Sequence, residues 1–310
     1  MNGHEKPMRH LPPPELLMQE ACADESQETT PEQNFSLCYP FYYAKVIKMD
    51  NFAHYKIVQI KLYSMNYTAE KIVPDPSTET SKGVQIEEMF NSIAPQYDLL
   101  NHTLSLGIDR SWRKKGILSL KEIHPRKILD IATGTGDLAI EAYNRLQPDQ
   151  ILGIDISEGM MSVGRTKTDQ KNLSDKIKFK REDCMNLTFQ DNSFDAAMVA
   201  FGIRNFEDLD KGLKEILRIL RPGGKLMILE LTTPEHFPMK QGYKIYSQIV
   251  IPLIGKLISG NKSAYTYLPK SISVFPQNKE MKKILEKNGF QEATYKKLSG
   301  GLCGLYTGKK

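Results

Sequence analysis

The most regular pattern in the chain is an alternation of short apolar runs with segments of helical hydrophobic spacing, beginning near residue 127. Ile128, Leu129 and Ile131 form the first apolar run, which is typical of a strand buried on both faces. Gly134 and Gly136 follow it, and apolar residues then resume at helical spacing. A strand, a glycine turn and a helix in this order predict the opening of a nucleotide-binding α/β unit.

The same alternation continues as far as residue 231. Four further strands are predicted at the apolar segments 151–154, 177–179, 194–201 and 225–231. Strands that alternate with helices predict a doubly wound, mostly parallel sheet. Asp155 ends the second strand about 20 residues after the glycines, where such folds bind ribose hydroxyls. Right-handed crossovers would bring Asp155, Asp183 and Arg204 to one edge of the sheet.

Two helices are predicted before the first strand. The first has an amphipathic stripe and is stopped by Pro95, after which residues 96–102 are predicted as a polar turn. Asp109 is expected to cap the second helix. The pair could form a lid over a site or simply cover a sheet edge. The stripe consists of Ile86, Met89, Phe90 and Ile93.

The alternation lapses after the fifth strand. Residues 243–258 form an apolar helical segment, which could be core, a substrate lid or a membrane-touching surface. Core is the commonest role for such a segment, and its place between two predicted strands favours a lid. A last helix is then predicted near Met281, and residues 290–307 are predicted to form a hairpin.

Composition narrows the class of protein. The net charge of +5 is spread along the chain, which favours a solvated surface over a nucleic-acid interface. Four cysteines without a C-x-x-C pair suggest neither a disulfide framework nor a zinc site, so a reducing cytosol is expected. No apolar run approaches the ~20 residues of a spanning helix. The cysteines are Cys22, Cys38, Cys184 and Cys303.

Residues 1–82 are predicted as an unpatterned extension and linker, and residues 83–310 as the folded domain. The extension lacks the basic start and clean apolar core of a secretory signal, and its acidic residues argue against a mitochondrial presequence. Residues 1–64 are expected to be either a mobile tail or a segment outside the natural protein. The second interpretation is favoured, because patterned sequence follows soon after Met65.

The glycine turn alone leaves the cofactor open. Its spacing, with Ala139 in third place, also satisfies the dinucleotide fingerprint and admits NAD. Three features favour S-adenosylmethionine: the segment 129–136, Glu182-Asp183-Cys184 after the third strand, and the terminal hairpin. They resemble a class I methyltransferase, with a Rossmann-like, mostly parallel seven-stranded sheet, an antiparallel last strand and an N-terminal helical lid.

Residues 84–310 resemble the ubiquinone/menaquinone biosynthesis C-methyltransferase family. Phe201-Gly202-Ile203-Arg204-Asn205 is the most specific block. Several independent motifs in the right order are far more specific than one glycine loop, and residues 1–64 lie outside the resemblance. The other blocks are Met89-Phe90-Asn91-x-Ile93-Ala94-Pro95-x-Tyr97-Asp98-x-x-Asn101, Gly107-Ile108-Asp109-x-x-Trp112-Arg113, Asp155-Ile156-Ser157-Glu158-Gly159-Met160, Asp191-Asn192-Ser193-Phe194-Asp195, Arg221-Pro222-Gly223-Gly224 and Tyr265-x-Tyr267-Leu268.

The resemblance implies S-adenosylmethionine as cofactor and no metal. It also implies C-methylation of a reduced, prenylated naphthoquinol, the last step of menaquinone synthesis. The alternatives are a prenylated benzoquinol of ubiquinone synthesis and an unrelated small molecule. Asp155 is expected to bind the ribose hydroxyls and Asp183 the adenine. The cofactor-binding residues implied are Gly134, Thr135, Gly136, Asp155, Asp183 and Cys184.

The same resemblance suggests catalytic roles for three residues. Arg204 would polarise the ring oxygen next to the methylated carbon, Asn205 would orient it, and Tyr97 would position the ring from the lid. Each has a structural alternative: Arg204 could pair with Asp98 or Asp208, and Tyr97 could simply pack.

Three other classes compete with this prediction: an NAD oxidoreductase, an RNA methyltransferase and a non-catalytic module with the same fold. Strand four lacks the Asn-Pro-Pro-Tyr sequence used on exocyclic amines, and no paired catalytic cysteines appear. We therefore expect a cytoplasmic enzyme that does not bind nucleic acid. It would contact the inner face of the cell membrane transiently through residues 243–258, and its oligomeric state stays open.

Overall fold

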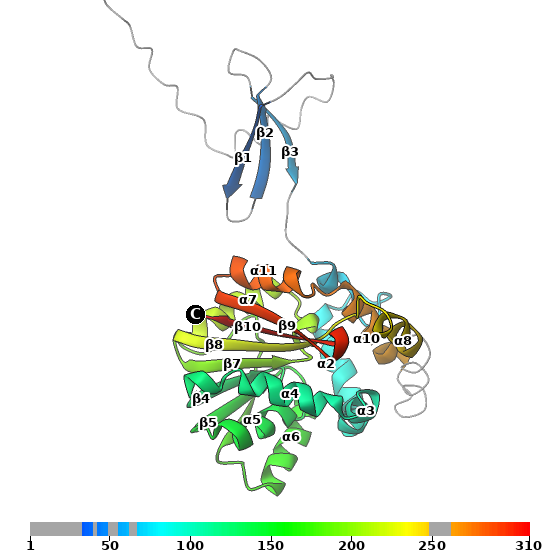
Figure 1. The fold of residues 1–310 in the computed structure, drawn as a ribbon, viewed down its shortest axis with the longest axis vertical. Coiled ribbons are helices and arrows are strands. Elements are labelled where there is room, and N and C mark those ends of the chain that lie inside the picture. Colours follow the sequence, from blue (N-terminus) through cyan, green and yellow to red (C-terminus); the bar gives the residue numbers. More distant parts are fainter. Residues whose placement is uncertain (1–32, 40–41, 49–54, 62–66, 248–261) are drawn as a thin grey trace, which may run out of the picture. The chain divides into compact units, whose positions relative to one another are not determined.

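The computed structural model describes residues 33–39, 42–48, 55–61, 67–247 and 262–310 (Figure 1). The chain divides into two compact units, Met1–Met65 and Asn66–Lys310. In the first unit, strands β1 (Gln33–Tyr39), β2 (Tyr42–Lys48) and β3 (Tyr55–Lys61) pair antiparallel in the order β1-β2-β3. No helix or strand is predicted here from the sequence. The alternating Phe35, Leu37 and Tyr39 are the period-two signal that was missed.

The second unit is built on a seven-stranded sheet with the order β6-β5-β4-β7-β8-β10-β9. Strand β10 runs antiparallel to both of its neighbours, and the other pairs from β6 to β8 are parallel. The expected doubly wound sheet and its terminal hairpin are therefore confirmed. The strands are β4 (Lys127–Ile131), β5 (Gln150–Asp155), β6 (Ile177–Arg181), β7 (Phe194–Ala200), β8 (Leu220–Leu231), β9 (Gln291–Leu298) and β10 (Cys303–Lys309).

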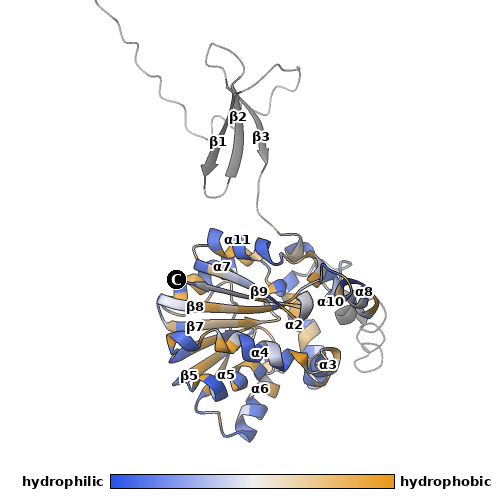
Figure 2. Cartoon of the chain, in the orientation of Figure 1, coloured by the Kyte–Doolittle hydropathy of each residue, from blue (hydrophilic) through white to orange (hydrophobic). Residues whose placement is uncertain are grey.

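Both faces of the sheet are covered by helices. Successive residues of β7 belong to different apolar clusters, because side chains along a strand alternate between faces. Ala197 packs in the cluster of α7 (Leu209–Ile219) and α11 (Lys279–Lys287), and Ala196 in that of α4 (Ile108–Leu118) and α5 (Asp137–Leu146). Figure 2 shows the central strands coloured as hydrophobic, in keeping with burial on both sides. Helix α6 (Glu158–Gln170) contacts β5 and β6.

The helices before β4 depart in detail from the expectation. Helix α2 (Lys82–Ile93) carries the predicted stripe, but the expected polar turn is a 3₁₀ turn, η2 (Ala94–Gln96), followed by α3 (Tyr97–Leu104). Pro95 stands in the first turn of η2, where its missing N–H costs nothing. Asp109 is the second residue of α4 and not its cap, because Gly107 occupies that position with φ +73°.

Residues 67–82, predicted as part of a linker, belong to the second unit, and Tyr67 and Glu70 contact its helix α7. The Tyr67 hydroxyl donates to Asp210 at 3.0 Å, and the backbone N–H of Leu209 donates to Glu70 at 2.8 Å. Glu70 belongs to the 3₁₀ turn η1 (Thr68–Lys71), and Tyr67 is the residue directly before it. Remaining short turns are η3 (Lys121–Ile123), η4 (Ile203–Asn205) and η6 (Ser299–Gly301).

The segment between β8 and β9 holds α8 (Met239–Ile245) and α10 (Lys262–Val274). The expected apolar segment 243–258 overlaps α8, and its part from residue 248 lies outside the described residues. In Figure 1, α8 and α10 lie at the same end of the sheet as α2 and α3. Within the described part of the chain, no helix is long and apolar enough to cross a membrane.

Candidate active site

The glycine turn after β4 is braced by the carboxylate of Asp155 at the end of β5. One carboxylate oxygen accepts the backbone N–H of Gly134 at 2.8 Å, and the other accepts that of Ser157 at 2.9 Å. Gly134 has φ +55° and Gly136 has φ +76°, a region that favours glycine. A Cβ at Gly136 would lie 2.9 Å from the Phe179 ring, so a side chain there has no room.

A cavity of about 470 Å³ opens beside this turn at the carboxyl ends of the parallel strands. Of the six residues predicted to bind the cofactor, four line it: Gly134, Asp155, Asp183 and Cys184. The helix α2 supplies one wall through Ile86, Glu87 and Phe90, among others. Burial raises the pKa of Asp155 and the pKa of the Cys184 thiol.

Thr135 and Gly136 do not line this cavity. The Thr135 side chain is buried, and its hydroxyl donates to Asp98 of α3 at 2.5 Å. Lys167 of α6 also donates to Asp98, at 2.8 Å, and it pairs with Asp137 at the start of α5. Thr135 therefore joins the glycine turn to the lid helix α3 in a polar network of three helices.

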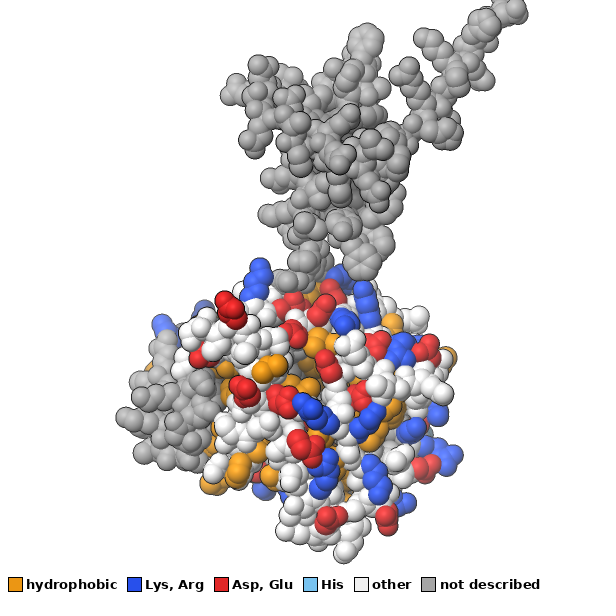
Figure 3. Space-filling model, turned by 180° about the vertical axis from the view of Figure 1, so that it is seen from behind, with side chains coloured by type: hydrophobic (Ala, Val, Ile, Leu, Met, Phe, Trp, Pro, Cys, Tyr) orange, Lys and Arg blue, Asp and Glu red, His pale blue; other side chains and the backbone are white. Residues whose placement is uncertain are grey.

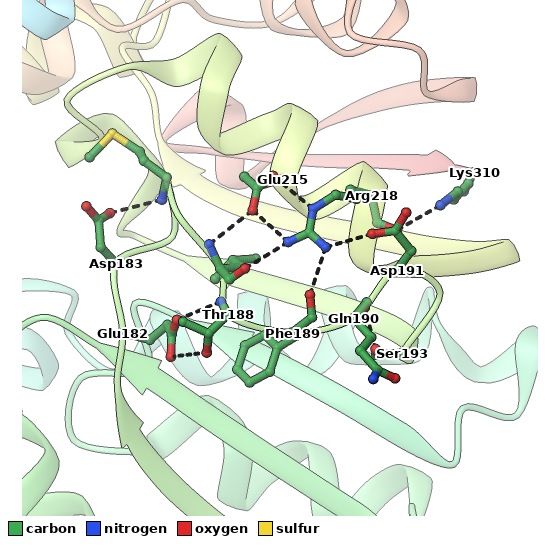
Figure 4. Close-up of polar contacts among 12 residues, drawn as sticks. Glu182, Asp183, Thr188, Phe189, Gln190, Asp191, Ser193, Glu215, Arg218 and Lys310 are labelled. Carbon is green, nitrogen blue, oxygen red and sulfur yellow. Dashed lines mark hydrogen bonds and ion pairs between the residues drawn. The ribbon is translucent and has the colours of Figure 1, made fainter.

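The loop that carries Asp183 and Cys184 is held by Arg218 of α7 (Figure 4). This guanidinium donates to the carbonyls of Leu187 at 2.8 Å and Phe189 at 2.7 Å. It also pairs with Glu215 and Asp191. Charge-assisted bonds of this kind are stronger than neutral ones, so the loop beside the cavity is fixed before any ligand binds.

A second cavity, of about 460 Å³, lies beneath the lid helices and is almost wholly apolar. Phe90, Tyr97 and Phe201 line both cavities and form the wall between them. The rings of Phe90 and Tyr97 meet edge to face, with centroids 5.9 Å apart. The other walls come from α3, α4, α8, α10 and η6, through residues such as Leu100, Trp112, Met239, Tyr243, Tyr246, Tyr267 and Leu302.

Arg204 is one of the few charged groups that line the apolar cavity, and it is 6% exposed. It pairs with neither Asp98 nor Asp208: its guanidinium donates to Glu230 at 2.8 Å and to the carbonyl of Phe201. Glu230, at the end of β8, is fully buried. Burial works against the charge of Arg204, but the Glu230 carboxylate outweighs it and raises the pKa of the guanidinium. The buried Nε of Arg204 has no hydrogen-bond partner among the described residues.

The neighbours of Arg204 are arranged by hydrogen bonds. The Tyr267 hydroxyl donates to the side-chain oxygen Oδ1 of Asn205 at 2.9 Å; Asn205 lines the first cavity and Tyr267 the apolar one. Buried Lys82 of α2 donates to the carbonyl of Arg204 at 3.3 Å and to that of Phe206 at 3.2 Å. Lys82 thus ties the first lid helix to the turn that carries Arg204.

The backbone is strained where strands β4 and β7 end. Ala132 has φ +52° and Phe201 has φ +59°, an unusual region for residues with side chains. A Cβ at Gly202 would lie 2.5 Å from the Cβ of Ala132, so only glycine permits this approach. Strain of this kind collects at functional sites, and here it forms the floor of the first cavity.

Asp130, beside the glycine turn, gives the site a measurable pH dependence. It is 1% exposed; Thr133 donates to one carboxylate oxygen at 2.6 Å, and the other has no partner among the described residues. Burial raises the pKa of Asp130 to about 7. The folded chain therefore keeps a proton that the unfolded chain releases near pH 4, so the free energy of unfolding falls as pH rises from about 4 to about 7.

We predict that Asp130→Asn removes this part of the pH dependence. Relative to the original chain, the variant should gain about 2 kcal/mol in free energy of unfolding between pH 5 and pH 7.5. Urea unfolding of both chains at the two pH values measures the gain. If the two chains differed in free energy of unfolding by the same amount at both pH values, Asp130 would titrate as an ordinary aspartate.

The sheet and its two cavities define a class of enzyme. The antiparallel β10 between β8 and β9 is the seventh strand expected of class I methyltransferases, and it distinguishes this sheet from dinucleotide-binding folds. The first cavity presents Asp155 and Asp183 at the strand ends where a nucleoside binds. The Asp155 carboxylate accepts backbone N–H groups, including those of Gly134 and Ser157, and two carboxylate oxygens offer about four acceptor positions, so one is left for a ribose hydroxyl. The chain is an S-adenosylmethionine-dependent methyltransferase.

The particular family follows from comparison with known proteins. The sequence profile of the ubiE/COQ5 methyltransferase family matches residues 78–310, and the chain belongs to that family. It is 59% identical over 246 residues to demethylmenaquinone methyltransferase of Bacteroides fragilis, covering 79% of this chain and 100% of that protein. It is 40% identical over 232 residues to the ubiquinone/menaquinone biosynthesis C-methyltransferase UbiE of Geobacter sulfurreducens, covering 74% and 90%.

Solved structures support the fold alone. The crystal structure of the cyclase SpnF aligns with a TM-score of 0.55 at 18% identity, covering 77% of this chain and 98% of that one. Two chains with so little sequence identity share the same fold, so the fold by itself does not decide which reaction is catalysed.

Two residues of the site were missed by sequence reasoning. Glu230 is a lone acid at the end of an apolar strand, a signal that could have marked it as facing the functional edge. Lys82 gave no such signal, because a lysine at a helix start is usually solvated.

Proposed function

We propose that this chain transfers a methyl group to a ring carbon of a prenylated demethylnaphthoquinol, converting demethylmenaquinol to menaquinol. The observation that carries the proposal is the wall of Phe90, Tyr97 and Phe201 between a nucleoside-binding cavity and an apolar one. A methyl donor on one side and an aromatic acceptor on the other would meet there. The names of the relatives point to the same substrate.

The cofactor cavity would hold S-adenosylmethionine through the residues predicted from the sequence. We assign the ribose hydroxyls to Asp155 and the adenine amino group to Asp183, with Gly134 and Cys184 in contact. Thr135 and Gly136 would act indirectly, by fixing the turn against α3 and Phe179. When bound, S-adenosylmethionine supplies an electrophilic methyl group with a good leaving group, so the protein has to align the acceptor and raise its electron density.

We assign to Arg204 the task of raising the electron density of the acceptor ring. Its charge is held by Glu230 and its side chain lines the apolar cavity, which would place a positive charge beside a ring oxygen of the acceptor. Stabilising negative charge on that oxygen would favour loss of the quinol hydroxyl proton to solvent, and the ring carbon next to the resulting phenolate is a better nucleophile than that of the neutral quinol. The carbon would form its bond to the methyl group as the carbon–sulfur bond breaks and S-adenosylhomocysteine is left, and the proton on that carbon would then leave to solvent, restoring the aromatic ring.

Two further residues position the ring. Tyr97 spans both cavities, and burial raises its pKa, so it stays a neutral hydroxyl that packs against the acceptor. Asn205 holds the hydroxyl of Tyr267, and burial raises the pKa of Tyr267 to about 12. Both are positioning residues and neither is placed to carry charge.

The substrate class is tested by transfer of a labelled methyl group. The purified chain is given S-adenosylmethionine labelled in its methyl group, with a reduced demethylnaphthoquinol and a reduced demethoxybenzoquinol in parallel. Transfer to the naphthoquinol alone is the expected result. Transfer to both would identify an enzyme of two pathways, and transfer to the benzoquinol alone would favour ubiquinone synthesis.

We propose that the protein works at the inner face of the cell membrane, because its proposed substrate carries a prenyl chain. A long prenyl chain keeps the substrate in a bilayer, and no described helix crosses one. The enzyme would therefore reach its substrate as a peripheral protein.

A further inference from the structure

Large apolar side chains are exposed on residues that line the apolar cavity or stand next to such residues in the chain. Leu106, after α3, is 82% exposed, Phe237 is 80% exposed and Ile245 is 60% exposed. Met239 is also exposed, and it lines the cavity together with Leu106. Single exposed apolar residues are normal, but several at one opening mark an interaction surface.

The two segments that carry these side chains are joined by a hydrogen bond and line the same cavity. The hydroxyl of Tyr246, just after α8, donates to the carbonyl of Leu104 at the end of α3. Leu106 and Met239 therefore lie on neighbouring segments on either side of the opening. We call the surface formed by Leu106, Phe237, Met239, Lys240, Lys244 and Ile245 the docking face.

The docking face carries positive charge and no compensating acid. Lys240 and Lys244 are exposed, stand one helical turn apart on α8, and form no ion pair with any residue that the structure describes. In the sequence, residues 236–278 contain five lysines and no aspartate or glutamate, and the whole chain has a net charge of +5. The excess positive charge of the chain is therefore concentrated in this stretch. On the face shown in Figure 3, in contrast, acidic and basic side chains are interspersed.

We propose that the docking face binds the surface of an anionic phospholipid bilayer, with the cavity mouth against the lipid. Phe237, Leu106 and Ile245 enter the boundary between headgroups and acyl chains, and Lys240 and Lys244 contact lipid phosphates. The proposal rests on the proposed function, because a prenylated quinol reaches the cavity directly from the bilayer. A cavity of about 460 Å³ encloses a molecule of drug size, so a long prenyl chain extends through the mouth.

A second copy of this chain fits the face less well. Two docking faces brought together would oppose four lysines without an acid between them, and like charges at contact repel. An anionic surface complements both the lysines and the apolar side chains.

The test is partition of the full-length chain onto vesicles, measured by sedimentation at low salt. Binding is expected to vesicles of phosphatidylcholine with phosphatidylglycerol, and weakly or not at all to phosphatidylcholine alone. The double variant Lys240→Gln/Lys244→Gln should bind the anionic vesicles about 25-fold more weakly, since each lysine near the surface contributes about fivefold. Phe237→Ser should weaken binding about tenfold.

The matched control is Lys279→Gln/Lys283→Gln. These two lysines are also exposed and one turn apart, on α11, and form no ion pair with a described residue. This variant should bind vesicles like the original chain. Equal loss in both double variants, or equal binding to neutral and anionic vesicles, would overturn the proposal. So would a concentration-dependent dimer in sedimentation equilibrium that Phe237→Ser abolishes.

Methyl transfer separates this proposal from the proposed function. With a short-chain quinol free in solution, Lys240→Gln/Lys244→Gln should keep full turnover, whereas turnover of a long-chain quinol in anionic vesicles should fall with binding. A chain that binds anionic vesicles but methylates no quinol would retain the docking face and overturn the proposed function. If the double variant turned over the long-chain quinol in vesicles as fast as the original chain does, the role of the docking face would be overturned.

Discussion

The double variant Arg204→Gln/Glu230→Gln is expected to lower kcat by about 10²–10³-fold and to leave cofactor affinity unchanged. The expected loss is that of one preorganised donor aimed at developing negative charge in a water-poor site. Cofactor affinity should hold, because Arg204 lines the apolar cavity and not the nucleoside cavity. Turnover is measured by labelled methyl transfer, and affinity by calorimetry with S-adenosylhomocysteine.

The double variant is needed because the two groups are buried together. Arg204→Ala alone would leave the Glu230 carboxylate buried and unpaired, at a cost of about 3–5 kcal/mol in free energy of unfolding. Two neutral glutamines avoid that charge and can bond to each other. Glu230→Gln alone keeps the guanidinium and should lower kcat less than the double variant. Full turnover by a folded double variant would contradict the role of Arg204.

Asp155→Asn should weaken binding of S-adenosylhomocysteine by about 10–100-fold. The variant loses charge-assisted bonds to the ribose hydroxyls, each worth roughly 1.5–3 kcal/mol. It also sets an amide NH₂ against the backbone N–H of Gly134 or Ser157, so the glycine turn loses one of its braces. Calorimetric titration of the ligand measures the change.

The matched control is Glu158→Gln, three residues along the chain. Glu158 is exposed, pairs with Arg165 and does not line the cavity. Its removal should change affinity by less than about twofold, because an exposed ion pair contributes little. Unchanged affinity of a folded Asp155→Asn chain would remove the carboxylate from the cofactor site.

The sheet could be predicted from the sequence because its strands are buried on both faces. Short, mostly apolar runs such as 128–131 and 194–200, each with a single aspartate, are local signals that need no tertiary information. The helix α3 was missed for the opposite reason. It is short and half of its residues are polar, and the contacts that hold it, such as Asp98 with Lys167 of α6, join residues far apart in the chain.

The residues of the candidate site likewise divide into those with a local sequence signal and those whose contacts depend on the tertiary structure. Gly134, Asp155 and Asp183 were predicted because their function is tied to a position relative to a strand end. The partner of Arg204 was not, since the choice of Glu230 over Asp98 or Asp208 as its counter-charge depends on how the ends of β7 and β8 lie side by side. Thr135 belonged to the right turn, but only the structure shows that its hydroxyl faces Asp98.

Methylation at a ring carbon of a reduced quinol is tested most directly by locating the transferred methyl group. The chain is incubated with S-adenosylmethionine carrying a ¹³C methyl group and with a demethylnaphthoquinol, in its reduced and in its oxidised form. We expect a product from the reduced form only, with a ¹³C signal of a methyl group on a ring carbon. A methyl ether, or equal transfer to the oxidised quinone, would contradict a mechanism in which Arg204 stabilises charge on a ring oxygen.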